Sequence, residues 1–439
     1  MRIVGKERCY HALPPTLLTR KWRALCGAVV CIHRGFTSGM ATFRRAFAMG
    51  AMGVMGFLYR NRLIRYTILG VVLLVLLVIA GGGWYFSGIL EADGLRIDNE
   101  PPEFKLTITA IGDGMITLRQ LDDADVEDNL SISAKWGVTN GETYGQLGDV
   151  LSESDALVTR EFVPQVGEFL VGQPVYLERT AYPHDPRSAH GLDYREVVIP
   201  GPIGNLGAWY VPPVSRSTEV WAVLVHGRTG DRDTSIKLLD DLSDLGIHSL
   251  TIDYRNDEGA PSSKSGYYDF GVTEWEDVEA ATSYAFENGA SKIILIGDSM
   301  GGGIVVNYQL QSDLADRTVG LILDAPMLNF GRTVDKGAEE RSVPPPITFA
   351  AKLFSTLRFG VDWGAMDFLS HANELNVPIL LFHGDADTTV PIETSLEFAE
   401  KLPELVELHT FEDTEHVQAW NLFTDEYEGL VRDFIERIR

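Results

Sequence analysis

Cysteine is almost absent from this chain of 439 residues, which contains three, all within the first 31 positions. The part of the chain beyond Cys31 therefore cannot form disulfides, use a thiol nucleophile or hold a cysteine-ligated zinc ion. A chain of this length can bury enough apolar surface to be stable without disulfides, so their absence does not exclude export.

Basic residues are scarce after position 65. Residues 1–65 contain twelve of the 37 Lys and Arg residues but only one of the 62 acidic residues, Glu7. The formal net charge of the whole chain is −25. An acidic body repels phosphate backbones, which argues against nucleic acid as a partner. A basic head before an acidic body instead indicates membrane topology.

No charged residue occurs in 66–90, a run of 25 residues that reads "YTILGVVLLVLLVIAGGGWYFSGIL". About 20 apolar residues span a bilayer core, so we predict one transmembrane helix. Arginines precede the run and acidic residues follow it, which predicts a single-pass protein of the cell membrane with a cytoplasmic N-terminus and residues 91–439 outside. A buried core helix and a signal peptide cleaved near 80–82 are the alternatives.

The regions flanking this segment differ in character. Residues 1–65 match no packed domain and are expected to be a disordered cytoplasmic head, whereas 91–102, which contains "DNEPPE", is predicted to be a tether. Residues 103–190 are predicted to form a small β-rich region of unknown role, with a hairpin turn at 112–114. The acidic stretch 121–128 lacks EF-hand spacing and is interpreted as a solvated loop, so neither a metal nor a cofactor is expected.

Residues 191–439 follow a different pattern, in which short apolar runs alternate with helix-like stretches. "LDYREVVIP" and "LGAWYVPP" predict two strands around a tight turn. Further predicted strands are "VWAVLVHG", "HSLTIDY", "KIILIGD", "VGLILDAP", "VPILLFHGD" and "ELHTF", and the predicted helices are 232–245, 273–288, 301–312, 393–402 and 417–438. This alternation predicts an α/β fold with a mostly parallel sheet covered by helices on both faces.

Ser299 lies in "GDSMGG", between the buried strand "IILIG" and a helix rich in small residues. This is the context of a nucleophile elbow, in which Gly297 and Gly301 leave room for a sharp turn that exposes the serine. The backbone N–H of Met300, at the helix start, is predicted to stabilise an oxyanion. The alternative interpretation is a glycine-rich turn of a nucleotide-binding fold.

A serine needs a base, and a base needs an orienting acid. Asp387 follows a predicted strand in "HGDADTTVP", and His416 follows the last one in "EDTEHVQAW". The order Ser299, Asp387, His416 is that of nucleophile, acid and base in α/β-hydrolases. Asp385 is the competing acid, and a surface-loop histidine is the alternative for His416.

A second oxyanion donor is expected in the loop after an early strand. In "VLVHGRTG", the backbone N–H of Arg228 occupies that position. Its side chain either contacts an anionic substrate group or faces solvent.

Together, "HGRTG", "GDSMGG", "HGDADTTVP" and "EHVQAW" resemble the α/β-hydrolase superfamily, in particular single-domain bacterial serine hydrolases related to prolyl-oligopeptidase-type and serine-aminopeptidase-type enzymes. The resemblance covers about 195–439. It implies Ser299 as nucleophile, Asp387 as acid, His416 as base, and a short cap over the active site at about 327–370. Phe and Leu side chains of the cap either line a substrate pocket or pack the cap on the core.

We therefore expect a membrane-anchored, extracytoplasmic serine hydrolase that cleaves small-molecule or lipid-like carboxylic esters through an acyl-enzyme. A peptidase or an acyltransferase uses the same triad, so both remain alternatives. A non-catalytic binding domain is the third, disfavoured because all three triad positions are intact. Nothing in the sequence indicates a protein partner.

Overall fold

The computed structural model describes residues 62–97, 102–121, 127–154, 156–214 and 216–439. Residues 1–61 of the predicted head at 1–65 therefore lie outside the described residues. Helix α2 (Arg62–Ile89) continues through a π-helical turn to Leu95. By length and composition, this helix is long and apolar enough to cross a membrane. A compact unit begins at Ile79 and ends at Arg439, and the fold described below belongs to it.

The prediction of a tether at 91–102 is wrong for the first half of that segment. The π-helical turn Leu90–Leu95 packs on the body, and Leu95 is buried in the largest hydrophobic cluster. Glu91 accepts hydrogen bonds from Tyr267 Oη at 2.9 Å and from Arg96 Nε at 2.6 Å. The acidic residues of this segment suggested that it is solvated. Instead, the Glu91 carboxylate has specific hydrogen-bond partners, and burial of the Leu95 side chain stabilises the segment on the body.

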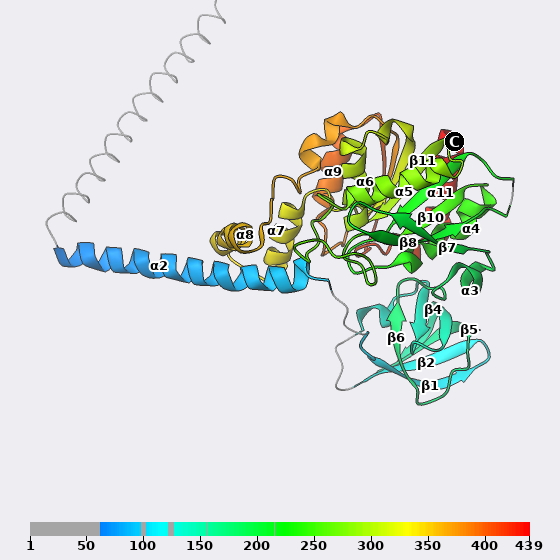
Figure 1. The fold of residues 1–439 in the computed structure, drawn as a ribbon. Coiled ribbons are helices and arrows are strands. Elements are labelled where there is room, and N and C mark those ends of the chain that lie inside the picture. Colours follow the sequence, from blue (N-terminus) through cyan, green and yellow to red (C-terminus); the bar gives the residue numbers. More distant parts are fainter. Residues whose placement is uncertain (1–61, 98–101, 122–126, 155, 215) are drawn as a thin grey trace, which may run out of the picture. The chain divides into compact units, whose positions relative to one another are not determined.

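After α2 and before β7 in the sequence, six antiparallel strands form a closed barrel (Figure 1). They are β1 (Leu106–Gly112), β2 (Met115–Gln120), β3 (Trp136–Thr139), β4 (Tyr144–Ser154), β5 (Leu157–Val166) and β6 (Pro174–Glu178), in the order β1-β2-β5-β4-β3-β6. The predicted hairpin is β1–β2. Its turn residues Asp113 and Gly114 have φ angles of 53° and 74°, as a two-residue turn between twisted strands requires.

A buried arginine holds one side of this barrel together. Arg160 on β5 has no exposed surface, and its guanidinium donates to the carbonyl oxygens of Gly148 (2.6 Å), Ala134 (2.9 Å), Leu130 (3.1 Å) and Asn129 (3.3 Å). Burial lowers the pKa of Arg160 to about 10, so the side chain remains protonated at neutral pH. A charged group in an apolar interior is tolerated only with such partners.

The second sheet has eight strands in the order β14-β13-β12-β11-β9-β10-β8-β7. Their bounds are β7 (Arg195–Pro200), β8 (Asn205–Val211), β9 (Val220–Val225), β10 (His248–Ile252), β11 (Lys292–Asp298), β12 (Thr318–Asp324), β13 (Ile379–Gly384) and β14 (Val406–Phe411). The pairs from β10 to β14 are parallel, and the β7–β8 and β8–β10 pairs are antiparallel. The predicted mostly parallel α/β sheet is confirmed.

Helices cover both faces of this sheet (Figure 1). Alternate residues of β9 enter two separate hydrophobic clusters, one containing α5 (Trp275–Glu287), α6 (Met300–Gln311) and α9 (Ile392–Lys401), the other α4 (Ile236–Asp244) and α11 (Thr424–Ile438). Because successive strand side chains point to opposite faces, one apolar run supplies both cores. The helix predicted at 417–438 is divided into α10 (Ala419–Leu422) and α11, and the short helix α3 (Pro186–His190) precedes β7.

Two helices between β12 and β13 occupy the position predicted for the cap. They are α7 (Phe330–Glu340) and α8 (Pro345–Phe359), and Figure 1 shows both near the C-terminal end of α2. Helix α8 begins with Pro345, whose missing N–H costs nothing in a first turn, and ends at Gly360 with a φ of 79°.

Candidate active site

Ser299 occupies the turn between β11 and α6 with φ of 50° and ψ of −116°, a conformation that few non-glycine residues adopt. Two backbone hydrogen bonds of 2.8 Å hold it there. The Ser299 N–H donates to the carbonyl of Asp324, and the Ser299 carbonyl accepts from the N–H of Met327. Such strain costs about 1–3 kcal/mol and persists mainly at functional sites.

The glycines flanking Ser299 are required by close backbone contacts. A Cβ atom on Gly301 would lie 2.1 Å from the carbonyl oxygen of Val225, and one on Gly297 would lie 2.5 Å from the carbonyl oxygen of Gly301. Neither contact can relax by moving a flexible side chain, because the obstructing atoms belong to the backbone. The space that the sequence predicted these glycines to leave is therefore present between β9, β11 and α6.

The structure brings Ser299, His416 and Asp387 together from three loops at one edge of the sheet. Ser299 Oγ donates to His416 Nε2 at 2.8 Å, and His416 Nδ1 donates to Asp387 Oδ2 at 2.7 Å. Both distances lie within the reach expected of a nucleophile, its base and an orienting acid. The side chain of His416 is 12% exposed and that of Asp387 is fully buried.

Asp387 is surrounded by donors. Its Oδ1 accepts hydrogen bonds from the N–H groups of Thr389 and Val390, both at 2.8 Å. Its Oδ2 also lies 3.2 Å from His383 Nε2. Burial alone would raise the pKa of this carboxyl, but the hydrogen bonds from His383 and His416 outweigh burial and hold the pKa well below its usual range. Asp387 is thus an anion at neutral pH, facing the ring nitrogen of His416.

The competing acid, Asp385, has a different contact. Its side chain is exposed, and Oδ1 accepts from the backbone N–H of Asp413 at 2.7 Å. This bond joins the loop after β13 to the loop that carries His416. Asp385 therefore supports the loop geometry, and the carboxylate at the imidazole belongs to Asp387.

Arg228 and Met300 line the same cavity as Ser299. Met300 is the first residue of α6, where backbone N–H groups have no partner within the helix. The role of the Arg228 and Met300 N–H groups as oxyanion donors remains a prediction.

The loop that carries Arg228 is fixed by a buried histidine. His226 Nδ1 lies 2.8 Å from the carbonyl oxygen of Gly227, and Nε2 lies 3.1 Å from Asp257 Oδ2. Both ring nitrogens face acceptors, which favours the imidazolium form. Burial alone would lower the pKa of His226, but the Asp257 carboxylate and these hydrogen bonds raise it to about 9.

Tyr254 supports the same loop from the other side. Its hydroxyl lies 3.0 Å from the carbonyl oxygen of Gly227, and its ring stacks on His226 with centroids 4.5 Å apart. No pattern in the sequence assigns a role to Tyr254 or Asp257. Only the fold brings them under the loop after β9.

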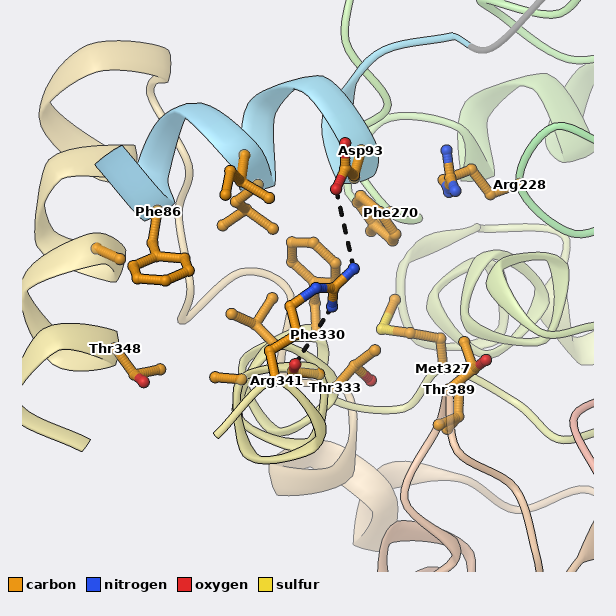
Figure 2. A pocket seen from close by; sticks show the side chains of 18 of the residues that line it. Phe86, Asp93, Arg228, Phe270, Met327, Phe330, Thr333, Arg341, Thr348 and Thr389 are labelled. Carbon is orange, nitrogen blue, oxygen red and sulfur yellow. Dashed lines mark hydrogen bonds and ion pairs between the residues drawn. The ribbon is translucent and has the colours of Figure 1, made fainter. Parts of the chain in front are cut away.

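An apolar cavity of about 330 Å³ opens at Ser299. The end of α2, the turn after it, α7 and α8 form its walls, and Figure 2 shows Phe86, Phe270, Phe330 and Met327 among the side chains that face it. Phe330 combines the two roles expected for Phe and Leu side chains of the cap, because it lines this cavity and is also buried in the largest hydrophobic cluster.

A second cavity, of about 240 Å³, also borders Ser299 and is lined by His416 and by three cationic side chains. Arg179 follows the last barrel strand, and its Nη1 donates to the backbone carbonyl of His416 at 3.0 Å. Lys237 on α4 pairs with Asp298 at 3.2 Å, and Arg228 completes the lining. Arg179 has no recognisable motif around it, so no signal in the sequence linked it to a histidine so distant along the chain.

Among the side chains that the structure describes, no cluster of three His, Cys, Asp or Glu residues forms a candidate metal site.

Known proteins resemble part of this chain. The serine aminopeptidase S33 family matches residues 217–363. A lysophosphatidylserine lipase of Danio rerio is 26% identical over 227 residues, which cover 43% of this chain and 53% of the lipase. The uncharacterised protein YqkD of Bacillus subtilis is 24% identical over 248 residues, 55% of this chain and 79% of YqkD.

The chain resembles the α/β hydrolases, and its eight-stranded sheet agrees with that fold. The predicted resemblance to serine-aminopeptidase-type enzymes is confirmed for this chain. The chain spans about half the length of the lysophosphatidylserine lipases that it matches. A solved esterase of Pyrococcus furiosus aligns with 56% of this chain and 92% of its own chain, at 23% identity and a TM-score of 0.46.

Proposed function

We propose that this hydrolase is a membrane-anchored carboxylic esterase that acts on lipid-like esters outside the cytoplasm. The proposal rests on one observation. Hydrogen bonds join Ser299 to His416 and His416 to Asp387, and Ser299 lines an apolar cavity. The series supplies a nucleophile with its base, and the cavity favours an acyl chain over a polar peptide.

In the proposed reaction, Ser299 Oγ attacks the ester carbonyl while its proton passes to His416 Nε2. Asp387, an anion at neutral pH, stabilises the resulting imidazolium and holds its Nδ1–H. The tetrahedral oxyanion accepts hydrogen bonds from the N–H groups of Arg228 and Met300. Its collapse breaks the bond to the leaving alkoxide, which takes the proton from His416. Water then attacks the acyl-enzyme by the same steps and releases the carboxylic acid.

Two cavities beside Ser299 suggest the two ends of the substrate. The apolar cavity would take the acyl chain, and the cavity lined by Arg179, Arg228 and Lys237 would take a polar leaving group that carries negative charge. Lys237 is paired with Asp298, so the two arginines supply the positive charge that an anion meets there. A lysophospholipid has this combination, and the similar protein of Danio rerio is a lysophosphatidylserine lipase.

Helix α2 supports the membrane anchor. The helix begins at Arg62, and acidic residues follow it. Its most apolar window has a mean hydropathy of 2.7, and none of that window is buried. These features favour a cytoplasmic N-terminus and a catalytic region on the opposite side.

A fluorophosphonate probe and a series of p-nitrophenyl esters with graded chain length test this function on the full chain in detergent. We expect labelling and turnover in the wild type and in the matched exposed variant Ser217→Ala, and neither in Ser299→Ala. Ser299-dependent labelling without ester turnover would favour the peptidase or acyltransferase alternative. A folded wild type that fails to label would overturn the nucleophile assignment.

A further inference from the structure

Helix α8 of the cap exposes large apolar side chains. Phe349, Leu353 and Leu357 are 73%, 51% and 70% exposed. A spacing of four residues places them on one face of the helix, where they form a continuous apolar stripe. Scattered single apolar residues are normal on a soluble surface, but three large ones in a row on one helix indicate a binding surface.

The adjacent face of α8 packs tightly against the end of α2. Gly83 lies so close to α8 that a Cβ on it would be 2.5 Å from the Cβ of Ala350. Arg358 donates to Ser87 Oγ at 2.5 Å and to the carbonyl of Trp84 at 2.8 Å, and its guanidinium lies 4.0 Å from the centroid of the Trp84 ring. These contacts fix the position of α8 beside the end of the candidate membrane helix.

The end of α2 has the composition of a membrane–water interface. Trp84 and Tyr85 are 55% and 64% exposed, and both residue types favour the headgroup level of a bilayer. Acidic residues follow within the next two turns, as expected for the aqueous side. The helix segment that α8 contacts is therefore the one that the proposed anchor places at the interface.

We propose that the face of α8 formed by Phe349, Leu353 and Leu357 inserts into the lipid bilayer that α2 spans. This inference rests on the proposed membrane anchor, and continuity with α2 identifies lipid as the occupant. An amphipathic helix at such a position buries its apolar face among headgroups and acyl chains. Arg358, held against Trp84, keeps its charge at the same level.

The placement gives the apolar cavity a lipid-facing entrance. Phe86 of α2 and Thr348 and Ala351 of α8 line the cavity, and Figure 2 shows Phe86 and Thr348 at the side of the pocket nearest α8. The exposed stripe and the cavity lining thus belong to the same short helix. An acyl chain would move from the bilayer to Ser299 past α8 without first entering water.

The insertion is tested on the full chain with Cys9, Cys26 and Cys31 replaced by serine and a fluorescent NBD label on Leu353→Cys. The matched control is Leu396→Cys on α9, a leucine 46% exposed on another helix. In phosphatidylcholine vesicles, we expect nitroxide-bearing acyl chains to quench the label at 353 and not at 396, and aqueous iodide to quench only the label at 396. Iodide quenching of both labels, or protection of position 353 from both quenchers by a second copy or a protein, would overturn the proposal.

A kinetic test separates insertion from chemistry. The variant Phe349→Ser/Leu353→Ser/Leu357→Ser should hydrolyse a long-chain ester embedded in vesicles at least about tenfold more slowly, because membrane binding scales with buried apolar area. Its hydrolysis of water-soluble p-nitrophenyl acetate and that of Leu396→Ser should stay within about twofold of the wild type. Equal hydrolysis of the embedded ester by variant and wild type would contradict insertion while leaving the esterase intact. A wild type inactive on both esters would contradict the proposed function, and the quenching experiment would still decide the insertion.

Discussion

Replacing Asp387 with asparagine changes one atom at the centre of the site. The asparagine oxygen can still accept from the N–H groups of Thr389 and Val390. Its amide NH₂ then faces His416 Nδ1 and His383 Nε2, where the wild type has an acceptor. Two donors cannot bond to each other, so His416 is driven to the tautomer with its proton on Nε2. That nitrogen can no longer accept the proton of Ser299.

The expected loss follows from this tautomer. We predict that kcat for ester hydrolysis falls about 10⁴-fold, as the same change does in a serine protease triad. A loss of this size corresponds to about 5.4 kcal/mol of transition-state stabilisation. The assay is steady-state hydrolysis of a soluble p-nitrophenyl ester by the full chain in detergent. KM should change little, because Asp387 is buried behind His416 and does not line either cavity.

Asp385→Asn is the matched control two residues away. Its oxygen still accepts from the N–H of Asp413, so kcat should stay within about threefold of the wild type. If Asp387→Asn retained more than a tenth of the activity while Asp385→Asn lost it, the assignment of the acid would be refuted.

Three further predictions concern the framework around the site. Gly301→Ala should abolish soluble or active protein, because its Cβ would meet the carbonyl of Val225 at 2.1 Å; recovery of full esterase activity would contradict the close approach. Arg160→Met leaves several buried carbonyls of the barrel without a donor and should lower the free energy of unfolding by at least about 3 kcal/mol, measured by urea titration. His226 has a pKa raised to about 9 in the folded state, so its stabilising charge is fully present below its ordinary pKa of 6.5 and is lost as pH rises through 9. The wild-type Tm should therefore fall between pH 6.5 and 9, and Asp257→Asn should be less stable at pH 6 and show a flatter profile; parallel profiles would contradict the ion pair.

The parts of the fold that the sequence predicted best are those in which one local pattern determines the outcome. The strand that precedes Ser299 is continuously apolar because both of its faces are buried, and the glycines after it indicate the sharp turn directly. The parallel sheet, the turn at Ser299 and the proximity of Ser299, Asp387 and His416 could therefore be predicted from the sequence, whereas the catalytic roles of these residues remain predictions.

The remainder depends on contacts between distant segments. Arg179 donates to His416 although 237 positions separate them, and no local pattern encodes such a bond. Leu95 follows acidic residues that suggested a tether, yet it is buried on the hydrolase core. The Phe and Leu residues of the cap were expected either to line a substrate pocket or to pack on the core, whereas Phe349, Leu353 and Leu357 are exposed. Periodicity defines the stripe on α8, but only the three-dimensional fold shows which side is covered.

The central claim is that Ser299 forms an acyl-enzyme. It is tested most directly by quenching the full chain with acid during turnover of a p-nitrophenyl ester and mapping the peptides by mass spectrometry. The account predicts that the acyl mass appears on the peptide containing Ser299, and that Ser299→Ala shows neither the adduct nor turnover. Undiminished hydrolysis by Ser299→Ala, or an acyl group on a different residue that turns over at the rate of catalysis, would contradict it.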